Sequence, residues 1–322
     1  MNLNMKIKNI KCVKDLMFSF PLEAGIYAIT GENGSGKSTV ISCASSVFYQ
    51  MPMTEYFGRP ANASIEFSLG ESYRKWIFDG KKWYPKSSEE KMRLNGFYEG
   101  SVIFGNRFRD TKLSVINILD GLTKSDLYEA SDFVKNNLGL ILRNDIEYYE
   151  NLYVVKKGIA DKMGLTRITF CNILKNGDLI SQPRMSTGEN LLLSILSSLE
   201  ALHNRRKRHN DGRPCIVFLD EIEIALHSSA LRRLVLFLKE IALDDDLSIF
   251  FSTHSIELLR EIKAQNIYYL SSLYNNSIMV TNPCYPAYAT RNLYGDDGYG
   301  NDLVILVEDD LAKLIIEKIL IS

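Results

Sequence analysis

A glycine-rich segment near the N-terminus has the residue types and spacing of a phosphate-binding loop. Residues 31–39 read Gly-Glu-Asn-Gly-Ser-Gly-Lys-Ser-Thr and match the pattern G-x-x-x-x-G-K-[ST], in which backbone N–H groups surround the phosphates of a nucleotide. We expect Lys37 to reach the β- and γ-phosphates and the Ser38 hydroxyl to bind Mg²⁺. The residues expected to contact the phosphates or the metal are Gly31, Asn33, Gly34, Gly36, Lys37, Ser38 and Thr39.

The segments on either side of the glycine-rich loop support this interpretation. Residues 26–30 form a short apolar run typical of a buried strand, and from Thr39 onward the apolar residues recur with helical spacing. A helix that begins there adds the positive end of its dipole to the anion site. The alternative is a glycine-rich loop that matches by chance, and the strand–loop–helix context argues against it.

Two acidic residues follow a second apolar run. Residues 215–219 read Cys-Ile-Val-Phe-Leu, a pattern typical of a strand in the middle of a parallel sheet, and Asp220 and Glu221 come directly after them. In nucleotide hydrolases the first such acid supports Mg²⁺ and the second polarises the attacking water. We therefore predict that Asp220 is a metal residue and Glu221 a catalytic one; the alternative is a strand that ends in two solvated carboxylates.

A histidine ends the next apolar run. His254 follows residues 247–252 and Thr253, and ligands of open α/β sheets gather beyond the carboxyl ends of the strands. We favour contact of His254 with the γ-phosphate over a purely structural role. The predicted catalytic residues are thus Lys37, Glu221 and His254.

Residues 185–189 read Met-Ser-Thr-Gly-Glu and resemble the signature motif of ABC-type ATPases, the superfamily that includes the SMC proteins. The resemblance implies that Ser186, Gly188 and Glu189 of one subunit close over the γ-phosphate held by another, in an ATP-dependent dimer or higher homo-oligomer. A Ser hydroxyl and the free N–H groups of a helix N-terminus suit such an anion clamp. Ser186 and Glu189 also have the spacing of a capping box, and the two roles are compatible.

Residues 220–227 narrow the resemblance. They read Asp-Glu-Ile-Glu-Ile-Ala-Leu-His and resemble the D-E-P-E-x-x-L-H string of the OLD (overcoming lysogenization defect) family, although Ile222 stands where many relatives have Pro. The resemblance implies ATP and Mg²⁺ as cofactors and a dimer interface that includes Glu223 and His227. It further implies that the ATPase controls a DNA-processing nuclease in defence against phage. No glutamine is assigned to a Q-loop, because Gln50 lies too early in the chain.

The C-terminal residues resemble the start of the TOPRIM nuclease domain that follows the ATPase in OLD-type proteins. Residues 302–307 form an apolar run that ends at Glu308, and a helical pattern follows. A TOPRIM site also needs a later strand with an Asp-x-Asp pair, and none follows Glu308, so we expect no nuclease activity from this chain alone. Either the chain is part of a longer protein, which we favour, or a separate partner carries the nuclease, as in two-component or retron-associated systems.

Composition limits the remaining functions. The chain has 322 residues with 46% hydrophobic content and a net charge of −1, which is typical of a globular protein with no overall attraction to nucleic acid. No apolar stretch is long enough to span a bilayer and the start does not resemble a signal peptide, so we expect a cytoplasmic protein that does not bind membranes. Five scattered cysteines are typical of reduced thiols.

A local basic run is the one candidate for contact with nucleic acid. Residues 203–213 are predicted to form a loop whose charges could bind a DNA or RNA backbone, although such a run is more often a solvated loop. The residues concerned are Arg205, Arg206, Lys207 and Arg208.

The elements expected around these motifs indicate an α/β fold, an ABC-type P-loop NTPase head with antiparallel N-terminal strands, a parallel core sheet and a helical insert. Strands are predicted at residues 5–10, 16–20, 64–69, 73–78, 101–104 and 167–174, with Asp79-Gly80 as a hairpin turn, and helices at 188–203, 228–241 and 256–262. Residues 1–300 are expected to form the ATPase domain, with a helical insert at about 111–160, and 301–322 an incomplete TOPRIM-like segment.

Two related classes fit less well. An SMC-like DNA-repair ATPase would need a long coiled coil, and the insert, helical at about 125–157, is too short and lacks sustained heptads. A transporter ATPase subunit is compatible with the phosphate loop, but the Leu226-His227 segment favours the OLD side.

Overall fold

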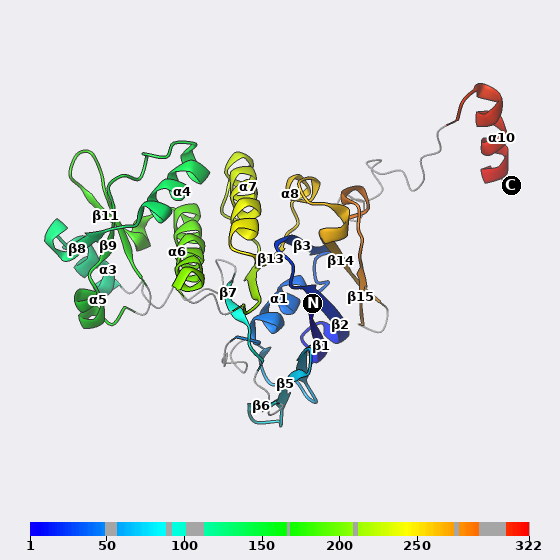
Figure 1. Ribbon diagram of the computed structural model, residues 1–322, viewed down its shortest axis with the longest axis horizontal. Coiled ribbons are helices and arrows are strands. Elements are labelled where there is room, and N and C mark those ends of the chain that lie inside the picture. Colours follow the sequence, from blue (N-terminus) through cyan, green and yellow to red (C-terminus); the bar gives the residue numbers. More distant parts are fainter. Residues whose placement is uncertain are drawn as a thin grey trace.

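The computed structural model describes residues 1–48, 57–87, 92–100, 113–165, 168–208, 212–273, 277–289 and 307–321. They form three sheets and the helices that cover them (Figure 1). The central sheet has the strand order β15-β14-β3-β13-β12-β7. Its strands are β3 (Gly25–Gly31), β7 (Asn95–Glu99), β12 (Cys215–Leu219), β13 (Leu247–Ser252), β14 (Ile267–Ser272) and β15 (Ile278–Thr281).

Neighbouring strands of the central sheet are parallel from β14 to β7, and only β15 at the edge is antiparallel. These strands are short, and β12 and β13 are mostly apolar and buried along their full length. A strand with both faces covered reads as a continuous apolar run rather than an alternating one. This explains why the pattern of residues 215–219 and 247–252 predicts these strands correctly.

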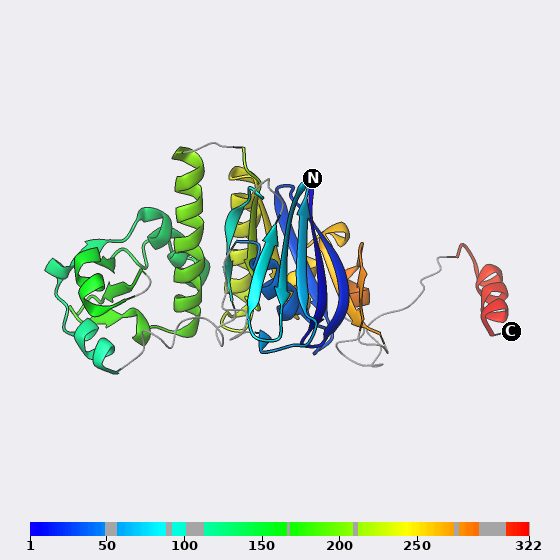
Figure 2. The same cartoon turned by 90° about the horizontal axis from the view of Figure 1, so that it is seen from below.

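A five-stranded antiparallel sheet packs beside the central sheet, and Figure 2 shows its long strands side by side. Its order is β2-β1-β4-β5-β6, from β1 (Asn2–Ile10), β2 (Val13–Pro21), β4 (Ser64–Leu69), β5 (Ser72–Phe78) and β6 (Trp83–Ser87). The predicted hairpin is confirmed: Phe78 pairs with Trp83, and the Asp79 carboxylate accepts the N–H groups of Lys81 and Lys82 at 2.8 Å.

Two hydrophobic cores lie on the two faces of the central sheet. Successive residues of β12 alternate between them: Val217 belongs to one and Phe218 to the other. The core that contains Phe218 joins the central sheet to helix α1 (Lys37–Ser45) and to the antiparallel sheet. The core that contains Val217 is covered by α4 (Asp132–Arg143), α6 (Thr187–Arg208), α7 (Ser228–Asp244) and α8 (Ile256–Arg260).

The insert predicted to be helical is a small α/β lobe. It contains a four-stranded antiparallel sheet of order β11-β10-β9-β8, formed by β8 (Leu127–Glu129), β9 (Leu152–Val155), β10 (Phe170–Ile173) and β11 (Leu179–Ser181). Helices α3 (Leu113–Asp120) and α5 (Lys157–Met163) accompany this sheet, with the 3₁₀ turn η2 (Lys124–Asp126), and Figures 1 and 2 show α6 between the lobe and the central sheet. The prediction of a wholly helical segment at 125–157 is therefore wrong for β8 and β9, because strands of three or four residues are too short to show a period of their own.

Three further elements lie outside the sheets and the helices that cover them. Short 3₁₀ turns occur at η3 (Gln182–Arg184) and η4 (Ala264–Asn266), and helix α10 (Asp310–Ile321) lies apart from the sheets in Figure 1. The strands predicted at 101–104 and 302–307 fall outside the described residues, apart from Val307. The predicted helix after Glu308 is confirmed by α10.

Candidate functional site

Three neighbouring strands end at the candidate nucleotide site. In the central sheet β3, β13 and β12 are adjacent and parallel. Their carboxyl ends therefore lie at one edge, with the phosphate-binding loop after β3, Thr253-His254 after β13 and Asp220-Glu221 after β12. The fold thus brings together the groups that the sequence predicted to act together, in the position where open α/β sheets bind ligands.

The loop has the conformation that its glycines allow. Gly34 and Gly36 have φ values of 82° and 94°, in the left-handed region that disfavours other residues, and Gly36 is the N-cap of α1. A Cβ at Gly31 would collide with the Leu270 carbonyl oxygen of β14. A Cβ at Gly34 would meet no atom within 4 Å, so the side of the loop at Gly34 is open.

The Lys37 ammonium lies inside the loop. The side chain is only 5% exposed, and Nζ donates hydrogen bonds to the carbonyl oxygens of Gly31 at 2.9 Å and Glu32 at 2.8 Å. Burial lowers the pKa of Lys37 to about 8, although the acids Glu221, Glu223 and Asp220 act in the opposite direction. A buried cation held mainly by neutral carbonyls would be stabilised by an anionic ligand.

Asp220 is held by the Ser252 hydroxyl group, with the Ser38 hydroxyl close enough to affect its pKa. Its carboxylate is 3% exposed, and Ser252 Oγ donates to Oδ1 at 2.5 Å. Burial raises the pKa of Asp220 to about 6, and hydrogen bonds from Ser252 and Ser38 partly offset this rise. The interaction between Ser38 and Asp220 joins the loop after β3 to the end of β12.

Glu221 has a backbone conformation unusual for its residue type. Its φ is 52°, in the left-handed region, and its N–H donates to Ser252 Oγ at 2.9 Å. An L-residue in this region costs about 1–2 kcal/mol, and such residues occur preferentially at functional sites. Ser252 therefore holds both acids in place, and sequence reasoning missed this residue because a serine at the end of a buried strand has no distinctive pattern.

The loops after β12 and β13 are also joined by Glu223. Its Oε1 accepts the backbone N–H of His254 at 2.6 Å, and its Oε2 is buried with no hydrogen-bond partner among the described residues. Burial raises the pKa of Glu223, an effect that the His254 N–H partly offsets. Burial and the nearby Lys37 ammonium lower the pKa of His254, which favours the neutral imidazole at pH 7. Glu223 therefore makes a contact within its own chain, whereas His227 is exposed as the N-cap of α7.

These residues fit a nucleotide phosphate and Mg²⁺. Lys37 supplies a buried cation, and the glycine turn leaves open space beside it. The Ser38 hydroxyl is close enough to the Asp220 carboxylate to lower its pKa, and Mg²⁺ prefers oxygen ligands of these kinds, usually together with water and substrate phosphates. No group of three or more His, Cys, Asp or Glu suited to a metal occurs in the described ranges, so the fit depends on a phosphate as a further ligand.

The signature-like segment forms the predicted capping box at the start of α6. The Glu189 N–H donates to Ser186 Oγ at 3.2 Å, and the Ser186 N–H donates to Glu189 Oε2 at 2.7 Å. Glu189 Oε1 also accepts the Tyr149 hydroxyl at 2.7 Å. The pKa of Glu189 is lowered because these hydrogen bonds outweigh the opposing effect of burial.

Gly188 has a packing role within its own chain. A Cβ there would lie 2.8 Å from the Ala225 carbonyl oxygen and 3.2 Å from Leu226 Cδ2. The start of α6 thus packs against the segment that follows the two acids. None of the hydrogen bonds of Ser186 and Glu189 in the described structure is to the phosphate-binding loop.

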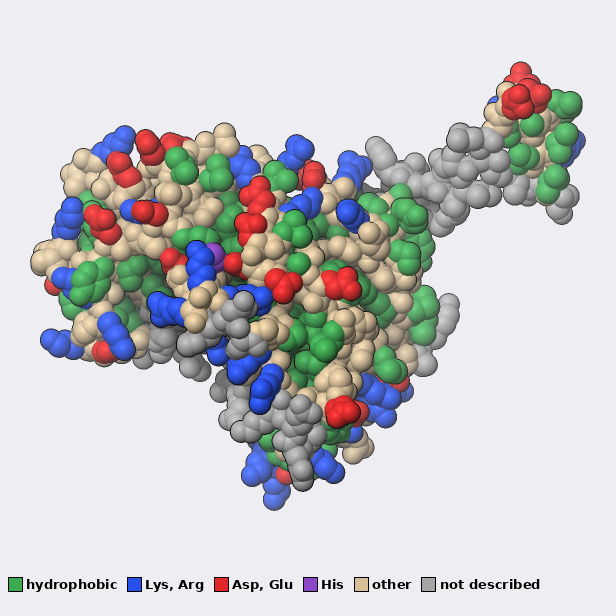
Figure 3. All heavy atoms as spheres, in the orientation of Figure 1, with side chains coloured by type: hydrophobic (Ala, Val, Ile, Leu, Met, Phe, Trp, Pro, Cys, Tyr) green, Lys and Arg blue, Asp and Glu red, His purple; other side chains and the backbone are tan. Residues whose placement is uncertain are grey.

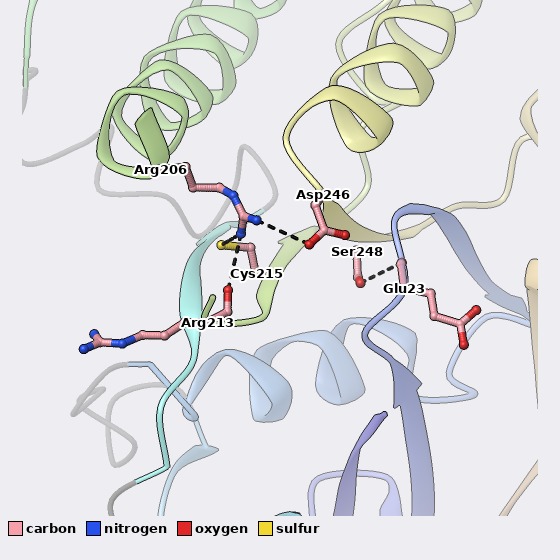
Figure 4. A network of polar contacts seen from close by, with 6 residues as sticks. All are labelled: Glu23, Arg206, Arg213, Cys215, Asp246 and Ser248. Carbon is pink, nitrogen blue, oxygen red and sulfur yellow. Dashed lines mark hydrogen bonds and ion pairs between the residues drawn. The ribbon is translucent and has the colours of Figure 1, made fainter. Parts of the chain in front are cut away.

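The basic run lies on a helix, not in the predicted loop. Arg205–Arg208 form the last turn of α6, where cationic side chains are favoured by the helix dipole. Arg206 is engaged internally: it donates to Asp246 Oδ2 at 3.3 Å, to the Arg213 carbonyl at 3.3 Å and to Cys215 Sγ at 2.9 Å (Figure 4). Arg205, Lys207 and Arg208 are exposed, and Figure 3 shows Lys and Arg side chains gathered between α6 and β7.

The structure describes only part of the predicted TOPRIM-like segment at residues 301–322. Glu308 is exposed and precedes α10, and the described residues place no other element of a TOPRIM site beside it.

No helix in the described part of the chain is long and apolar enough to cross a membrane.

Two sequence-family models match parts of the chain. One is described as an AAA domain and matches residues 4–149; the other is described as "AAA domain, putative AbiEii toxin, Type IV TA system" and matches residues 115–260. Each spans less than half of the 322 residues. No curated protein matches the chain.

Solved structures of SMC heads are similar in fold. One is an SmcHead bound to the C-winged helix domain of ScpA, with 13% identity and a TM-score of 0.50 over 86% of this chain and 96% of that chain. Another is the Smc head domain with an extended coiled coil bound to the C-terminal domain of ScpA derived from Pyrococcus furiosus, with 13% identity and a TM-score of 0.50 over 87% and 95%. The predicted fold class is thereby confirmed: the chain has the mixed α/β fold of an SMC/ABC-type ATPase head, with sequence similar to AAA domains.

Proposed function

We propose that the chain binds ATP with Mg²⁺ and hydrolyses it in a site completed by the signature segment of a second copy. The observation that carries this proposal is the convergence of Lys37, the Ser38–Asp220 pair and Glu221 at the ends of β3 and β12. Phosphoryl transfer to water requires a cation beside the phosphates, oxygen ligands for Mg²⁺ and a group that orients the attacking water. Lys37, the Ser38–Asp220 pair and the Glu221 carboxylate can supply these three.

Each residue has a distinct role in this proposal. Lys37 binds the β- and γ-phosphates, Ser38 and Asp220 hold the metal, and Glu221 orients the attacking water and accepts its proton. The neutral His254 imidazole donates a hydrogen bond to the γ-phosphate. Mg²⁺, when bound, neutralises charge on the phosphate oxygens. The remaining loop residues Gly31, Asn33, Gly34, Gly36 and Thr39 supply backbone or hydroxyl contacts to the phosphates.

The signature segment is proposed to act from the partner copy. Within one chain Ser186 is exposed and bonded to Glu189, and it makes no hydrogen bond to the phosphate-binding loop among the described residues. The N-terminus of α6 carries the positive end of the helix dipole, which would favour an anion bound by another subunit. A head-to-tail dimer would place Ser186, Gly188 and the backbone of Glu189 of each copy against the γ-phosphate of the other, so that ATP drives dimerisation.

The first experiment measures mass and ATP turnover together. Light scattering with ATP and Mg²⁺ is carried out on the wild type and on Lys37→Ala, Ser186→Arg and Glu221→Gln. We expect ATP-driven dimers in Glu221→Gln and loss of turnover in all three variants. A stable monomer that hydrolyses ATP regardless of the Ser186 substitution would contradict the composite site and leave a simple P-loop NTPase.

The cellular role we propose is nucleotide control of a DNA-processing nuclease in cytoplasmic anti-phage defence. Its support is the OLD-like segment at residues 220–227 and the match to a model whose description names a toxin of a toxin–antitoxin system. The nuclease would lie in a TOPRIM domain beyond Glu308 or, as the alternative, in a separate chain for which this ATPase is the scaffold. Arg205, Lys207 and Arg208 are the proposed nucleic-acid contacts, because Arg206 is already bonded to Asp246. The genomic sequence downstream of codon 322 distinguishes a TOPRIM domain in the same chain from a separate nuclease chain. Only the former requires an in-frame strand with an Asp-x-Asp pair.

A further inference from the structure

The loops that follow β12 and β13 carry the proposed catalytic groups, and they are fastened to each other at two points. Ser252 makes the first connection, because it bonds to both the Asp220 carboxylate and the Glu221 N–H. The second connection is the 2.6 Å hydrogen bond from the His254 N–H to Glu223 Oε1. Ser252 thus fixes the acids at the strand ends, whereas Glu223 reaches from the acidic loop to the residue that carries the imidazole.

The geometry points to Glu223 as a positioning residue that sets His254 relative to Glu221. This inference rests on the proposed function, since it assigns His254 and Glu221 to one reaction. Glu223 touches the backbone of His254 and not the reacting atoms, so its effect on ATP hydrolysis would be indirect. The OLD resemblance had instead implied that Glu223 faces a second subunit.

The nature of the bond supports a positioning role. A carboxylate oxygen that accepts a backbone N–H at 2.6 Å makes a short, charge-assisted hydrogen bond, and Glu223 is largely withdrawn from solvent. Because the bond fixes the backbone of His254, only two side-chain torsions remain for the imidazole. The other carboxylate oxygen, Oε2, is buried and has no hydrogen-bond partner in the described structure, so the His254 N–H is the bond that orients this side chain.

The chain order adds to this argument. Glu223 is two residues beyond Glu221, in the turn that follows its left-handed backbone. A shift of the acidic loop would therefore move Glu221 and the acceptor of the His254 N–H together. The water-orienting carboxylate and the phosphate-binding imidazole would keep their mutual geometry when nucleotide binding moves either loop.

The test compares two substitutions of Glu223, each of which changes one property of the side chain. Glu223→Gln keeps the length of the side chain and a carbonyl acceptor but removes the charge. Glu223→Asp keeps the charge but withdraws the acceptor by one methylene. Glu257 is an exposed carboxylate in the first turn of α8, three residues beyond His254, and Glu257→Gln and Glu257→Asp are the matched controls. For each variant kcat and KM for ATP are measured with Mg²⁺, and the imidazole resonances of His254, assigned with His254→Gln, are recorded by NMR without nucleotide.

We expect Glu223→Asp to lower kcat by about a hundredfold with KM for ATP unchanged, since a displacement of about 1 Å in a positioned group has effects of this size. Glu223→Gln should stay close to the wild type, and the His254 resonances should move in Glu223→Asp alone. Equal loss of kcat in both variants would overturn the proposal, because a positioning role predicts that only Glu223→Asp is impaired. Wild-type kcat in Glu223→Asp would also overturn it, and if Glu223→Gln alone lost kcat the role would belong to the charge. If the wild type hydrolyses no ATP, the proposed function fails, while unmoved His254 resonances in Glu223→Asp would separately overturn the positioning role.

Discussion

Ser252 Oγ, at the end of β13, donates a 2.5 Å hydrogen bond to the carboxylate of Asp220, at the end of β12. The same oxygen accepts the N–H of Glu221 at 2.9 Å. One buried hydroxyl thus satisfies the carboxylate that we propose binds the metal and the backbone of the acid that we propose orients the water. The preorganisation of the acidic pair depends on the neighbouring strand as well as on β12 itself.

Substitution of Ser252 by Ala should therefore impair catalysis more than folding alone explains. Removal of the hydroxyl leaves a buried carboxylate oxygen and a buried N–H without partners, which costs about 1–3 kcal/mol for such a group. We expect ATP turnover to fall by at least about tenfold, because both acids lose their common anchor. Urea denaturation and steady-state ATPase assays measure the two effects.

Ser248 provides the matched control for Ser252. It lies on the same strand, at the end far from the acids, and its Oγ donates to the Glu23 carbonyl at 2.8 Å (Figure 4). Ser248→Ala should lower the free energy of unfolding by a comparable amount with kcat unchanged. Equal losses of kcat in Ser248→Ala and Ser252→Ala would show that the effect of Ser252 is general destabilisation.

Substitution of Glu221 by Gly should be less harmful to stability than substitution by Ala, although both should abolish ATP turnover. Its φ of 52° suits glycine, so Glu221→Gly relieves backbone strain that Glu221→Ala retains. We expect the Gly variant to be more stable than the Ala variant by about 1 kcal/mol in denaturant unfolding, while both lose ATP turnover. An Ala variant as stable as the Gly variant would contradict a left-handed backbone at this position.

The raised pKa of Asp220 predicts the pH dependence of the nucleotide-free protein. Native Asp220 keeps its proton up to about pH 6, whereas the unfolded chain releases it near the ordinary value of 3.8. The native state therefore binds more protons between these values, and this contribution to stability is present below pH 3.8 and lost as the pH rises through 6. Thermal unfolding between pH 4 and 7 should show the loss, and Asp220→Asn should reduce it.

The same group gives Mg²⁺ binding the opposite pH dependence. Only the ionised carboxylate is a good Mg²⁺ ligand, so Mg²⁺-dependent ATP affinity should rise by about tenfold for each pH unit up to about 6 and then level off. Titrations at fixed ionic strength would measure this, with Asp220→Asn as the comparison. An affinity in the wild type that does not change with pH would exclude Asp220 as a metal ligand.

Much of the site could be predicted because its residues follow short, buried and mostly apolar strands. The glycine-rich loop, Asp220-Glu221 and His254 each stand at the end of such a run, and parallel strands bring those ends to one edge. The connections between these residues could not be predicted in the same way. Ser252 is one polar residue at the end of a buried strand, and the left-handed backbone of Glu221 has no sequence signal, since glycine would be the expected residue there.

In the lobe, the strands β8 and β9 could not be predicted from the sequence. Residues 127–129 and 152–155 lie in a stretch whose apolar residues recur with helical spacing, yet they pair as β8 and β9. Their conformation is fixed by partners distant in the chain, since β9 also pairs with β10 beyond α5. Tertiary pairing therefore decides the structure of strands too short to have a period.

Two substitutions of Ser186 separate its capping role from its proposed role in the partner site. Asn and Asp are both good N-caps, so either should preserve the bond with the Glu189 N–H, whereas Ser186→Ala should cost about 1 kcal/mol. Only Asp places a negative charge where the γ-phosphate of a second copy is expected. We therefore expect Ser186→Asn to keep ATP-driven dimerisation and turnover and Ser186→Asp to lose both, with equal thermal stability, as measured by light scattering, ATPase assay and melting temperature. Equal turnover in the two variants would limit Ser186 to the capping of α6, because a carboxylate cannot approach a bound triphosphate without strong repulsion.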